Sequence, residues 1–526
     1  MNKIKTYKFE EDTIKNIEKF KQGKNWPVVY ILEDGKEAYV GETINAFNRS
    51  KEHYKNSDRK KLNNIHIISD NEFNKSATLD LESSLIEYMS ADGIFKLQNS
   101  NKGLINHNYY EREKYQAKLE ILWDQLKDKN LAKNSLIQIR NFDLFKFSPY
   151  KSLSLDQEST ANAIIGVIDL QENSTHLISG GPGTGKTILA LYLVKLMKSL
   201  DNTKNLEVGL VIPMTSLRQT LKRVFKSING LKAKMVIGPS DVVKQKYDVL
   251  IVDEAHRLKR RKNITNYGSF DNNNRKLGIN IHEGTELDWI QLQSDHQILF
   301  YDQNQSVKPS DIPQERFSQL KEQYGTIEHF LSSQMRVLGG EDYINYIDNI
   351  LNFNQTEFET FNDYDVKLYK DIKVMHNDIK ELEKQYGLCR LVAGIAWEWK
   401  KDDSEYDFII NGVKLKWNTE AKDWVNSENS INEVGCIHTI QGYDLNYAGV
   451  IIGPELSYDK HNNKLVIHEE KYLDTKGKSA IEDKSELVAY IKNIYKTLLT
   501  RGIKGTYIYV VDEDLRDYLS SFFEIV

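Results

Sequence analysis

The sequence predicts an α/β chain, with a small α+β part near the N-terminal end and a larger part built on parallel sheets. Three observations favour this fold class. An apolar run at residues 176–178 is followed by GGPGTGKT and a helix-like segment, which is the strand–loop–helix order of a phosphate-binding loop. A second apolar run leads into the acids of VLIVDEAH at 249–256. Two strand-like runs flank Asp34-Gly35, a dipeptide typical of a β-hairpin.

The first elements expected are the two strands of this hairpin, VVYIL and EAYVG. Each strand carries one tyrosine, Tyr30 or Tyr39. A helix is expected to begin near Ile44, and Arg49 and His53 lie four residues apart on it, so they share one face. Two phenols, a guanidinium and an imidazole are therefore expected to converge beside the hairpin.

A second helix is expected over residues 76–91. Glu82 falls on its apolar face, one turn before Leu85, whereas Glu87 points away. A carboxylate among apolar neighbours is costly unless it is paired or bound to a metal. Glu82 is therefore either a metal ligand or one partner of a structural salt bridge, for example with Arg49.

Residues 25–105 resemble a GIY-YIG endonuclease domain. The match consists of Val28, Val29, Tyr30, Tyr39, Val40, Gly41, Arg49, His53, Glu82 and Asn99. Val28-Val29 stands where the family's first motif has Gly-Ile. The resemblance implies a structural or substrate-positioning role for Asn99, and Asn101 competes for that role.

The same resemblance implies a role for each of the other polar side chains. Glu82 would bind one divalent cation, Mg²⁺ or Mn²⁺, which activates water or stabilises the leaving oxygen. Arg49 would stabilise the charge that develops on the phosphate. Tyr30, Tyr39 and His53 would together handle the proton of the attacking water.

The phosphate-binding loop fits the pattern G-x-x-x-x-G-K-[ST]. Its glycines allow backbone N–H groups to converge on the phosphates of ATP. Lys186 is expected to reach the β- and γ-phosphates, and the Thr187 hydroxyl is expected to bind Mg²⁺. A stray glycine-rich loop is the alternative, but it would not explain the strand before it or the acids downstream. The residues expected at the nucleotide are Gly180, Gly181, Pro182, Gly183, Thr184, Gly185, Lys186 and Thr187.

The acids of VLIVDEAH complete this expected site. Asp253 is expected to hold Mg²⁺ through water, and Glu254 to polarise the attacking water. A buried strand that merely ends in two acids is the alternative. It explains neither the pair nor the phosphate loop upstream.

Further polar blocks follow the loop in a collinear order, after a glutamine that precedes it. Their members are Gln157, Thr215, Arg218, Asp302, Gln305, Gln334, Arg336, His438, Thr439, Gln441, Gly442, Thr500 and Arg501. With these blocks, roughly residues 150–526 resemble superfamily 1 helicases, especially their Schlafen group 3 branch.

This second resemblance implies two RecA-like lobes with ATP between them. Gln157 would read adenine, and Asp302 and Gln305 would couple the nucleotide state to nucleic acid. Arg336 and Arg501 would reach the γ-phosphate from the second lobe. The H-T-x-Q-G block would lie at the lobe interface, with His438, Thr439, Gln441 and Gly442.

Together the resemblances imply a small α+β GIY-YIG-like domain followed by two RecA-like parallel-sheet lobes. Residues 1–135 would form the nuclease-like domain with a helical linker. Residues 136–335 would form the first lobe, with the phosphate loop and the DEAH segment. Residues 336–526 would form the second lobe, with an insertion.

Composition limits the remaining possibilities. The 526-residue chain has a net charge of −5, so any nucleic-acid surface must be local. One candidate is the basic run 257–262 before an expected polar loop at 263–274, although such a run can equally be a solvated face. Two cysteines make neither a zinc site nor an expected disulfide. No apolar run is long enough to cross a membrane, and we expect a cytoplasmic protein.

Four tryptophans in the second lobe's insertion, Trp397, Trp399, Trp417 and Trp424, are expected in the core more than as base-stacking platforms. The leading functional hypothesis is an ATP-dependent nuclease that acts on nucleic acid, DNA in preference to RNA, in defence against foreign DNA such as phage. One alternative is an ATP-gated binding switch with a weak nuclease module. The other is a repair helicase in which the nuclease fold is incidental. A protein partner or a homo-oligomer stays open.

Overall fold

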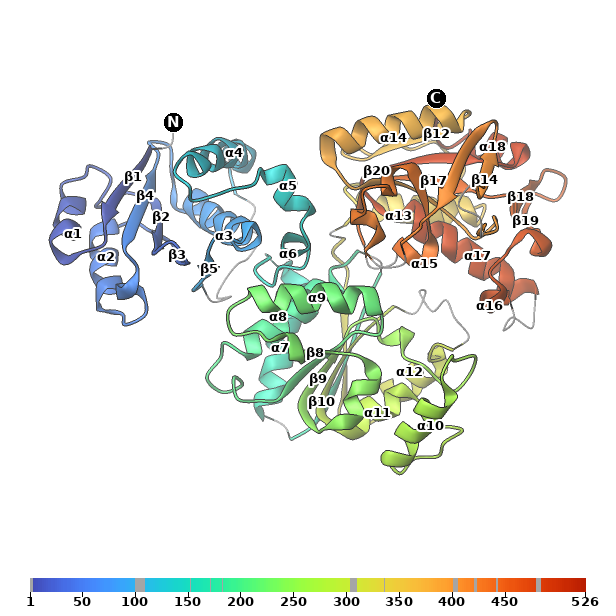
Figure 1. The fold of residues 1–526 in the computed structure, drawn as a ribbon, viewed down its shortest axis with the longest axis horizontal. Coiled ribbons are helices and arrows are strands. Elements are labelled where there is room, and N and C mark those ends of the chain that lie inside the picture. Colours follow the sequence, from blue (N-terminus) through green and yellow to red (C-terminus); the bar gives the residue numbers. More distant parts are fainter. Residues whose placement is uncertain are drawn as a thin grey trace.

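The computed structural model describes residues 3–99, 109–151, 153–170, 172–181, 183–302, 310–334, 336–400, 405–420, 423–440, 443–478 and 484–526. Three bodies, each built on its own sheet, follow one another along the chain (Figure 1). The N-terminal domain lies beside the first lobe, and the second lobe lies on the other side (Figure 1). The segment between the N-terminal domain and the first lobe lies where these two bodies and the second lobe meet (Figure 1).

The N-terminal sheet has the strand order β1-β4-β2-β3-β5. Its strands are β1 (Lys3–Lys8), β2 (Val28–Glu33), β3 (Glu37–Thr43), β4 (Asn64–Ser69) and β5 (Lys96–Leu97). The predicted hairpin is confirmed, because β2 and β3 pair antiparallel with Tyr30 opposite Gly41. Gly35 in the turn has a φ of 86°, which favours glycine.

Helices cover both faces of this sheet, which is why every residue of β2 is buried. One face packs with α1 (Glu11–Glu18) and α2 (Ala46–Lys55), through residues such as Ile17 and Phe47. The other face packs on α3 (Lys75–Asp92). The Asn74 side chain accepts from the Ala77 N–H at the start of α3, and Gly93 ends the helix in a left-handed conformation. The second predicted helix is thus confirmed.

Three further helices join this domain to the rest of the chain. They are α4 (Arg112–Asp128), α5 (Leu136–Asn141) and α6 (Asp143–Lys146). We call residues 135–146, which comprise α5 and α6, the connector. Its first helix begins with a reciprocal cap, in which Ser135 accepts from the Gln138 N–H and the Gln138 side chain accepts from the Ser135 N–H.

The first lobe contains a sheet in the order β11-β6-β10-β9-β7-β8, and every strand pair in it is parallel. Its strands are β6 (Ser174–Gly180), β7 (Val208–Val211), β8 (Val236–Ile237), β9 (Tyr247–Val252), β10 (Ser294–Tyr301) and β11 (Thr326–Leu331). Its helices are α7 (Leu155–Leu170), α8 (Lys186–Met197), α9 (Thr215–Ser227), α10 (Tyr267–Lys276), α11 (Glu286–Gln293) and α12 (Gln314–Lys321). The carboxyl ends of neighbouring parallel strands meet at one sheet edge, which brings the ends of β6, β9 and β10 together.

The expectation of a polar loop over residues 263–274 is wrong, because α10 begins inside it. The Asn266 side chain accepts from the Ser269 N–H and caps the helix. Phe270 is buried against Trp289, whose indole N–H donates to the Asn274 side chain. Capping and tertiary packing therefore overcome the low helix propensity of an asparagine-rich segment.

The second lobe contains a sheet in the order β14-β15-β16-β13-β17-β20-β12-β21, which is parallel except for the β14–β15 hairpin. Its strands are β12 (Asp365–Tyr369), β13 (Cys389–Ala393), β14 (Phe408–Ile410), β15 (Val413–Trp417), β16 (Glu433–Cys436), β17 (Leu445–Ile452), β20 (Gly502–Val510) and β21 (Glu524–Ile525). A separate hairpin is formed by β18 (Leu456–Asp459) and β19 (Lys464–Ile467). Its helices are α13 (Gly340–Leu351), α14 (Ile372–Tyr386), α15 (Ile437–Ile440), α16 (Thr475–Lys478), α17 (Lys484–Leu499) and α18 (Glu513–Leu519).

The tryptophans of the insertion were expected in the core more than as base-stacking platforms. Trp417 and Trp424 are fully buried, as expected for core residues. Trp399 is 46% exposed and stacks on Trp417, with ring centroids 4.4 Å apart. Cys389 and Cys436 are both free. Over the described part of the chain, no helix has the length and apolar character needed to cross a membrane.

Candidate active sites

The phosphate loop connects the end of β6 to the start of α8. Gly183 and Gly185 have φ values of 84° and 75°, a region that favours glycine. The Lys186 ammonium donates to the carbonyl oxygens of Gly180, at 2.6 Å, and Gly181, at 2.9 Å. The loop therefore curls around the lysine and leaves the N-terminus of α8 at its centre, an arrangement suited to an anion. Pro182 lies outside the described residues.

Asp253 follows β9 and faces the first turn of α8. The Thr187 hydroxyl donates to Asp253 Oδ2 at 2.7 Å. Asp253 is fully buried, and its Oδ1 atom has no hydrogen-bond partner among the described residues. Burial and the neighbouring Glu254 raise the pKa of Asp253 to about 7. A buried carboxylate beside a hydroxyl provides the oxygen ligands that Mg²⁺ prefers, so these two residues fit that ion.

Glu254 has a different environment from its neighbour. Its backbone has a φ of 54°, in the left-handed region. Its carboxylate lies 3.0 Å from His256 Nε2 and 2.9 Å from Arg257 Nε. Burial raises its pKa, but His256, Arg257 and Lys186 outweigh burial and hold the pKa well below its usual range. Glu254 is therefore ionised and can accept a hydrogen bond from a water molecule.

Asp302 follows β10 at the same sheet edge. Its carboxylate lies 3.7 Å from the Lys186 ammonium. Its backbone N–H donates to His256 Nδ1 at 3.1 Å, which ties the end of β10 to the acids after β9. Gln305 lies outside the described residues.

Gln157 supports the phosphate loop in this conformation. It is fully buried, its amide donates to the Thr184 carbonyl at 2.9 Å, and its oxygen accepts from the Ser154 N–H at 3.1 Å. The role of Gln157 in reading adenine stays a prediction. The contact with the loop was not foreseen from the sequence.

Arg336 approaches this site from the segment that leads into the second lobe. A Cβ on Gly183 would lie 2.8 Å from the Arg336 Cβ atom and 2.0 Å from Gln334 Oε1, so this segment packs directly on the phosphate loop. The Arg336 guanidinium pairs with Asp444, with 2.6 Å between Nε and Oδ1. Sequence reasoning missed Asp444, since it lies two residues after the H-T-x-Q-G block.

Arg501 lies deeper in the same place. It is 5% exposed and donates to the Tyr443 carbonyl at 3.2 Å, and its Nε atom has no hydrogen-bond partner in the part of the chain that the structure describes. Burial, together with the positive charge of Arg336, lowers the pKa of Arg501 to about 9. Two neighbouring guanidinium groups in a buried place are suited to receive an anion.

The H-T-x-Q-G block lies in the second lobe between β16 and β17. His438 Nε2 lies 2.9 Å from Asp474 Oδ2, and the Thr439 hydroxyl donates to the Asn418 side chain at 3.1 Å. Gln441 and Gly442 lie outside the described residues.

A second cluster forms beside the N-terminal hairpin. Tyr30 is buried, and its hydroxyl lies 2.6 Å from His53 Nε2. Arg49 Nε donates to the same hydroxyl at 3.3 Å. The ring of Tyr39 lies 5.1 Å from the ring of His53. A Cβ on Gly41 would lie 2.3 Å from the Tyr30 hydroxyl, so glycine is needed there for the tyrosine to reach its partners.

The protonation of this cluster follows from its burial. Burial raises the pKa of Tyr30, and burial together with Arg49 and Arg59 lowers the pKa of His53 to about 3. The imidazole is therefore neutral at physiological pH. Arg59 lies 4.0 Å from the centroid of the Tyr39 ring and was missed in the sequence, where it fits no motif.

Glu82 lies on α3 beside the end of β3. It is half-buried, and burial together with the charge of Glu42 raises its pKa to about 7. Arg49, considered as a salt-bridge partner of Glu82, instead pairs with Glu52 at 2.6 Å. Glu42 was not foreseen, and its carboxylate accepts from the Thr78 hydroxyl at 3.4 Å.

A metal at Glu82 would have few protein ligands. Among the described residues, no group of three or more His, Cys, Asp or Glu side chains is placed to hold a metal ion. A half-buried carboxylate with a raised pKa still fits a cation held by a single glutamate, because a divalent ion would supply the missing positive charge.

Asn99 has a positioning role. Its side chain is buried, accepts from the Val40 N–H at 3.0 Å and donates to the Val40 carbonyl at 2.7 Å. It therefore fixes β3 one residue after Tyr39. Asn101 lies outside the described residues.

The role of the basic run 257–262 in tracking phosphates stays a prediction. Arg257 is buried against Glu254 at the phosphate site. Arg261 pairs with both carboxylate oxygens of Asp271, at 2.7 and 3.0 Å. Two of the cations in the run are thus engaged in structural pairs.

Residues 173–512 match the family described as Schlafen group 3, DNA/RNA helicase domain. The chain belongs to this family. The match covers the phosphate loop, the acids after β9 and both arginines of the second lobe. It begins after the N-terminal domain.

Individual relatives were also found. An uncharacterized protein of Saccharomyces cerevisiae is 27% identical over 424 residues, which cover 70% of this chain and 90% of that protein. A DNA complex of the arterivirus helicase, nonstructural protein 10, is 13% identical with a TM-score of 0.31, over 70% of this chain and 65% of that one. The Pif1 helicase from Bacteroides, with ADP-AlF3 and single-stranded DNA, is 10% identical with a TM-score of 0.27, over 68% and 92%. Such TM-scores are too low to argue from, so the assignment rests on the family match.

Proposed function

We propose that this helicase-family chain is an ATP-driven nucleic-acid motor joined to a metal-dependent endonuclease of the GIY-YIG type. The observation that carries the proposal is the presence of two separate clusters of catalytic type in one chain. One cluster surrounds the phosphate loop, and the other surrounds Tyr30 and Glu82. Among the described residues, the side chains named for one cluster differ from those named for the other.

The motor half rests on the groups that meet at the phosphate loop. When bound, Mg²⁺ would neutralise charge on the phosphates, held by Thr187 and Asp253. Glu254, which is ionised, would polarise the attacking water. Arg336 and Arg501 would stabilise charge at the γ-phosphate. Loss of the γ-phosphate after hydrolysis would let the two lobes move relative to each other.

The nuclease half rests on the cluster beside the hairpin. The neutral His53 and the Tyr30 hydroxyl, 2.6 Å apart, form a short path for a proton from water. Arg49 would hold the phosphate, and Glu82 would hold Mg²⁺ or Mn²⁺ as a Lewis acid. Val28 and Val29 are fully buried in the core, so the altered first motif leaves the polar side chains of the cluster in place.

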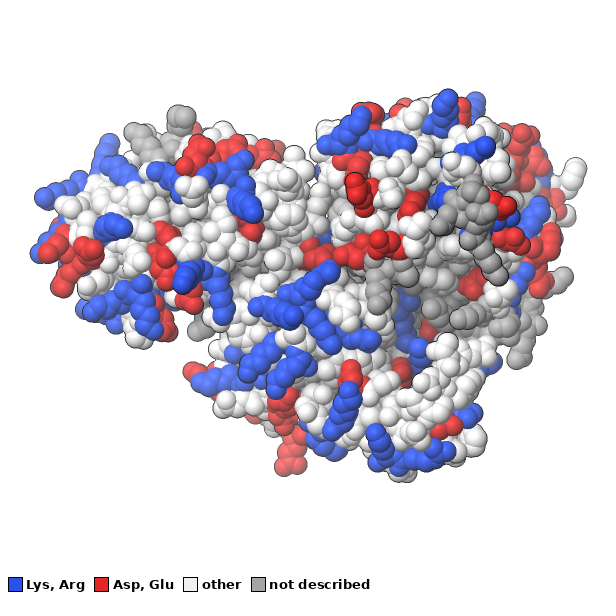
Figure 2. Space-filling view, in the orientation of Figure 1, with Lys and Arg blue, Asp and Glu red and all other residues white. Residues whose placement is uncertain are grey.

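The nucleic-acid surface we favour is on the first lobe. Figure 2 shows Lys and Arg side chains gathering near α9 on this lobe, although the chain as a whole has a net charge of −5. Exposed cations there include Arg223 and Lys226 on α9 and Lys232 and Lys234 beyond it. A local positive surface of this kind suits a phosphodiester backbone. We propose DNA as the substrate in preference to RNA, and defence against foreign DNA such as phage as the role.

Purified protein tests the proposal on labelled single- and double-stranded DNA and RNA with Mg²⁺ or Mn²⁺, with and without ATP. Cleavage of at least one substrate and ATP hydrolysis stimulated by nucleic acid are expected. Stimulated hydrolysis with every substrate left intact would instead favour the ATP-gated binding switch. Intact substrates, together with a Glu82→Ala variant that protects cells from phage as well as the natural chain, would exclude the nuclease half.

A further inference from the structure

The connector touches the helix that carries Glu82. Arg140 Nε donates to the Tyr88 hydroxyl of α3 at 2.8 Å. The Phe145 ring stacks on the Tyr88 ring, with centroids 4.8 Å apart and planes at 30°. Tyr88 lies less than two turns after Glu82 on the same rigid helix, so a shift of the connector is transmitted to the carboxylate.

The other side of the connector reaches the second lobe at the ATP site. Lys146, the residue after Phe145, donates from its ammonium to the Asp444 carbonyl at 3.0 Å. Asp444 is the residue whose carboxylate holds Arg336 at 2.6 Å. Asn141 adds a second attachment, since its oxygen accepts from the Asn446 amide at 3.0 Å. Lys146 and Asp444 therefore link the aromatic contact on α3 to the Arg336 guanidinium, which is expected at the γ-phosphate.

The charges around Asp444 favour this arrangement. Burial raises the pKa of the Asp444 carboxyl, but Arg336, Lys146 and Arg501 outweigh burial and hold it below its usual range. If Arg336 turns to the γ-phosphate, Asp444 loses its nearest cation. Lys146 then balances more of the negative charge of the Asp444 carboxylate, and the backbone of Asp444 moves with Lys146.

The first lobe is tied to the same point. Arg223 of α9 lies 3.1 Å from Asp143 Oδ2 in the connector and 3.2 Å from Asp423 Oδ2 in the second lobe. One guanidinium thus joins the connector to both lobes. Any change in the angle between the lobes must alter at least one of these two ion pairs.

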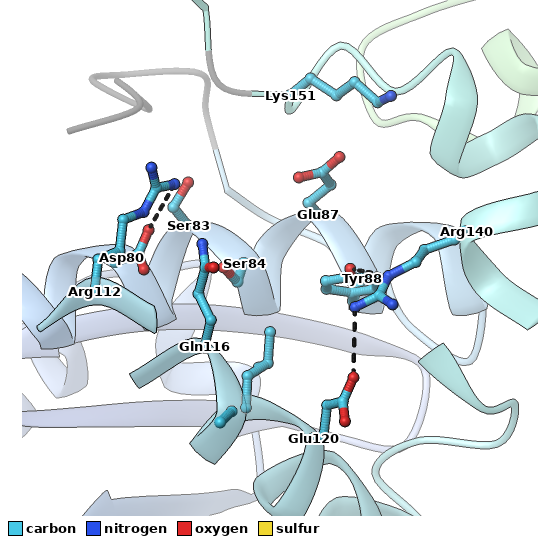
Figure 3. A pocket seen from close by; sticks show the side chains of 12 residues that line it. Asp80, Ser83, Ser84, Glu87, Tyr88, Arg112, Gln116, Glu120, Arg140 and Lys151 are labelled. Carbon is cyan, nitrogen blue, oxygen red and sulfur yellow. Dashed lines mark hydrogen bonds and ion pairs between the residues drawn. The ribbon is translucent and has the colours of Figure 1, made fainter. Parts of the chain in front are cut away.

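The contact between the connector and α3 has room to adjust. Figure 3 shows a cavity beside it, with a volume of about 610 Å³, into which polar side chains of α3, α4 and the connector region point. Its labelled lining residues are Asp80, Ser83, Ser84, Glu87, Tyr88, Arg112, Gln116, Glu120, Arg140 and Lys151. A polar, open interface can shift without the loss of close packing that an apolar core would suffer.

We propose that Lys146 is a positioning residue for Arg336, and that through Lys146 the connector couples the ATP site to the nuclease-like domain. The inference rests on the proposed function, in which Arg336 acts on the γ-phosphate and Glu82 acts in cleavage. ATP competes with Asp444 for Arg336, and the connector transmits the release of Asp444 to α3. The coupling is reciprocal, so a substrate that orders α3 also changes the affinity for ATP.

Lys146→Met tests the positioning role, because it keeps most of the unbranched side chain and removes its charge and its hydrogen bond. The expected result is about a tenfold fall in kcat for ATP hydrolysis with less than a twofold change in KM for ATP. Lys146→Arg should restore most of kcat, which a merely structural side chain would not require. Lys133→Met, at an exposed lysine before the connector, should behave as the natural chain.

Hydrogen exchange tests the coupling without requiring either reaction. A nonhydrolysable ATP analogue should change the exchange of α3 amides in the natural chain and leave it unchanged in Lys146→Met, while both protect the phosphate loop. Protection of the loop with no change in α3 of the natural chain would overturn the coupling, as would an unaltered response or an unaltered kcat in Lys146→Met. A natural chain in which the analogue does not protect the loop would instead refute the proposed ATP site.

Discussion

Arg501→Met should make the nucleotide-free protein more stable while it removes ATP hydrolysis. The Arg501 guanidinium is 5% exposed and lies near that of Arg336. The fall in its pKa from 12.5 to about 9 corresponds to about 5 kcal/mol of unfavourable free energy for the charged form. Methionine removes this cost but also removes the hydrogen bond to Tyr443, worth about 1–3 kcal/mol. A net gain of about 2–4 kcal/mol follows.

Calorimetry measures the gain in stability of Arg501→Met, and ATPase kinetics measure its loss of ATP hydrolysis. A lobe of this size should gain about 2–4 °C in Tm per kcal/mol, so its transition should rise by about 4–16 °C. Loss of an arginine that stabilises the γ-phosphate should lower kcat by about 10³-fold or more. Arg516→Met, at an arginine of α18 that donates to the Val510 carbonyl at 3.3 Å, should leave kcat unchanged and should not raise Tm. A variant with a lower Tm and at least a tenth of the natural kcat would refute the reasoning.

Three further predictions concern single residues of the two sites. Gly41→Ala should abolish cleavage and leave ATP hydrolysis intact, because its methyl group would lie 2.3 Å from the Tyr30 hydroxyl; equal loss of both activities would contradict this. Cleavage at limiting Mg²⁺ should fall as the pH drops below about 7, where Glu82 becomes protonated and no longer binds the cation, and excess Mg²⁺ should move the midpoint to lower pH. A pH profile flat from 5 to about 8 at limiting Mg²⁺ would exclude that role. Thr187→Ala should raise the Mg²⁺ concentration needed for half-maximal ATP hydrolysis about tenfold or more, and an unchanged requirement would place the ion elsewhere.

The parts of the structure that sequence predicted are those encoded locally. The hairpin at Asp34-Gly35, the helices carrying His53 and Glu82, and the strand–loop–helix around Lys186 each depend on residues close together in the chain. Parallel strands then bring separate motifs to one sheet edge without further information.

The parts that sequence could not predict depend on distant contacts. Asp444 and Lys146 are 298 positions apart, and neither belongs to a motif that announces the other. Arg59 reaches Tyr39 only because of the turn after α2. The error over α10 has the same origin, since the burial of Phe270 is a tertiary fact that an asparagine-rich segment does not reveal.

Parallel assays of Lys186→Ala and Glu82→Ala, each for ATP hydrolysis and for cleavage, test most directly whether the chain joins a motor to a nuclease. Glu82→Ala should lose cleavage and keep the natural kcat for ATP. Lys186→Ala should lose ATP hydrolysis and keep the cleavage that the natural chain shows without nucleotide. Cleavage by Glu82→Ala at the natural rate, or ATP hydrolysis by Lys186→Ala at the natural rate, would contradict the account.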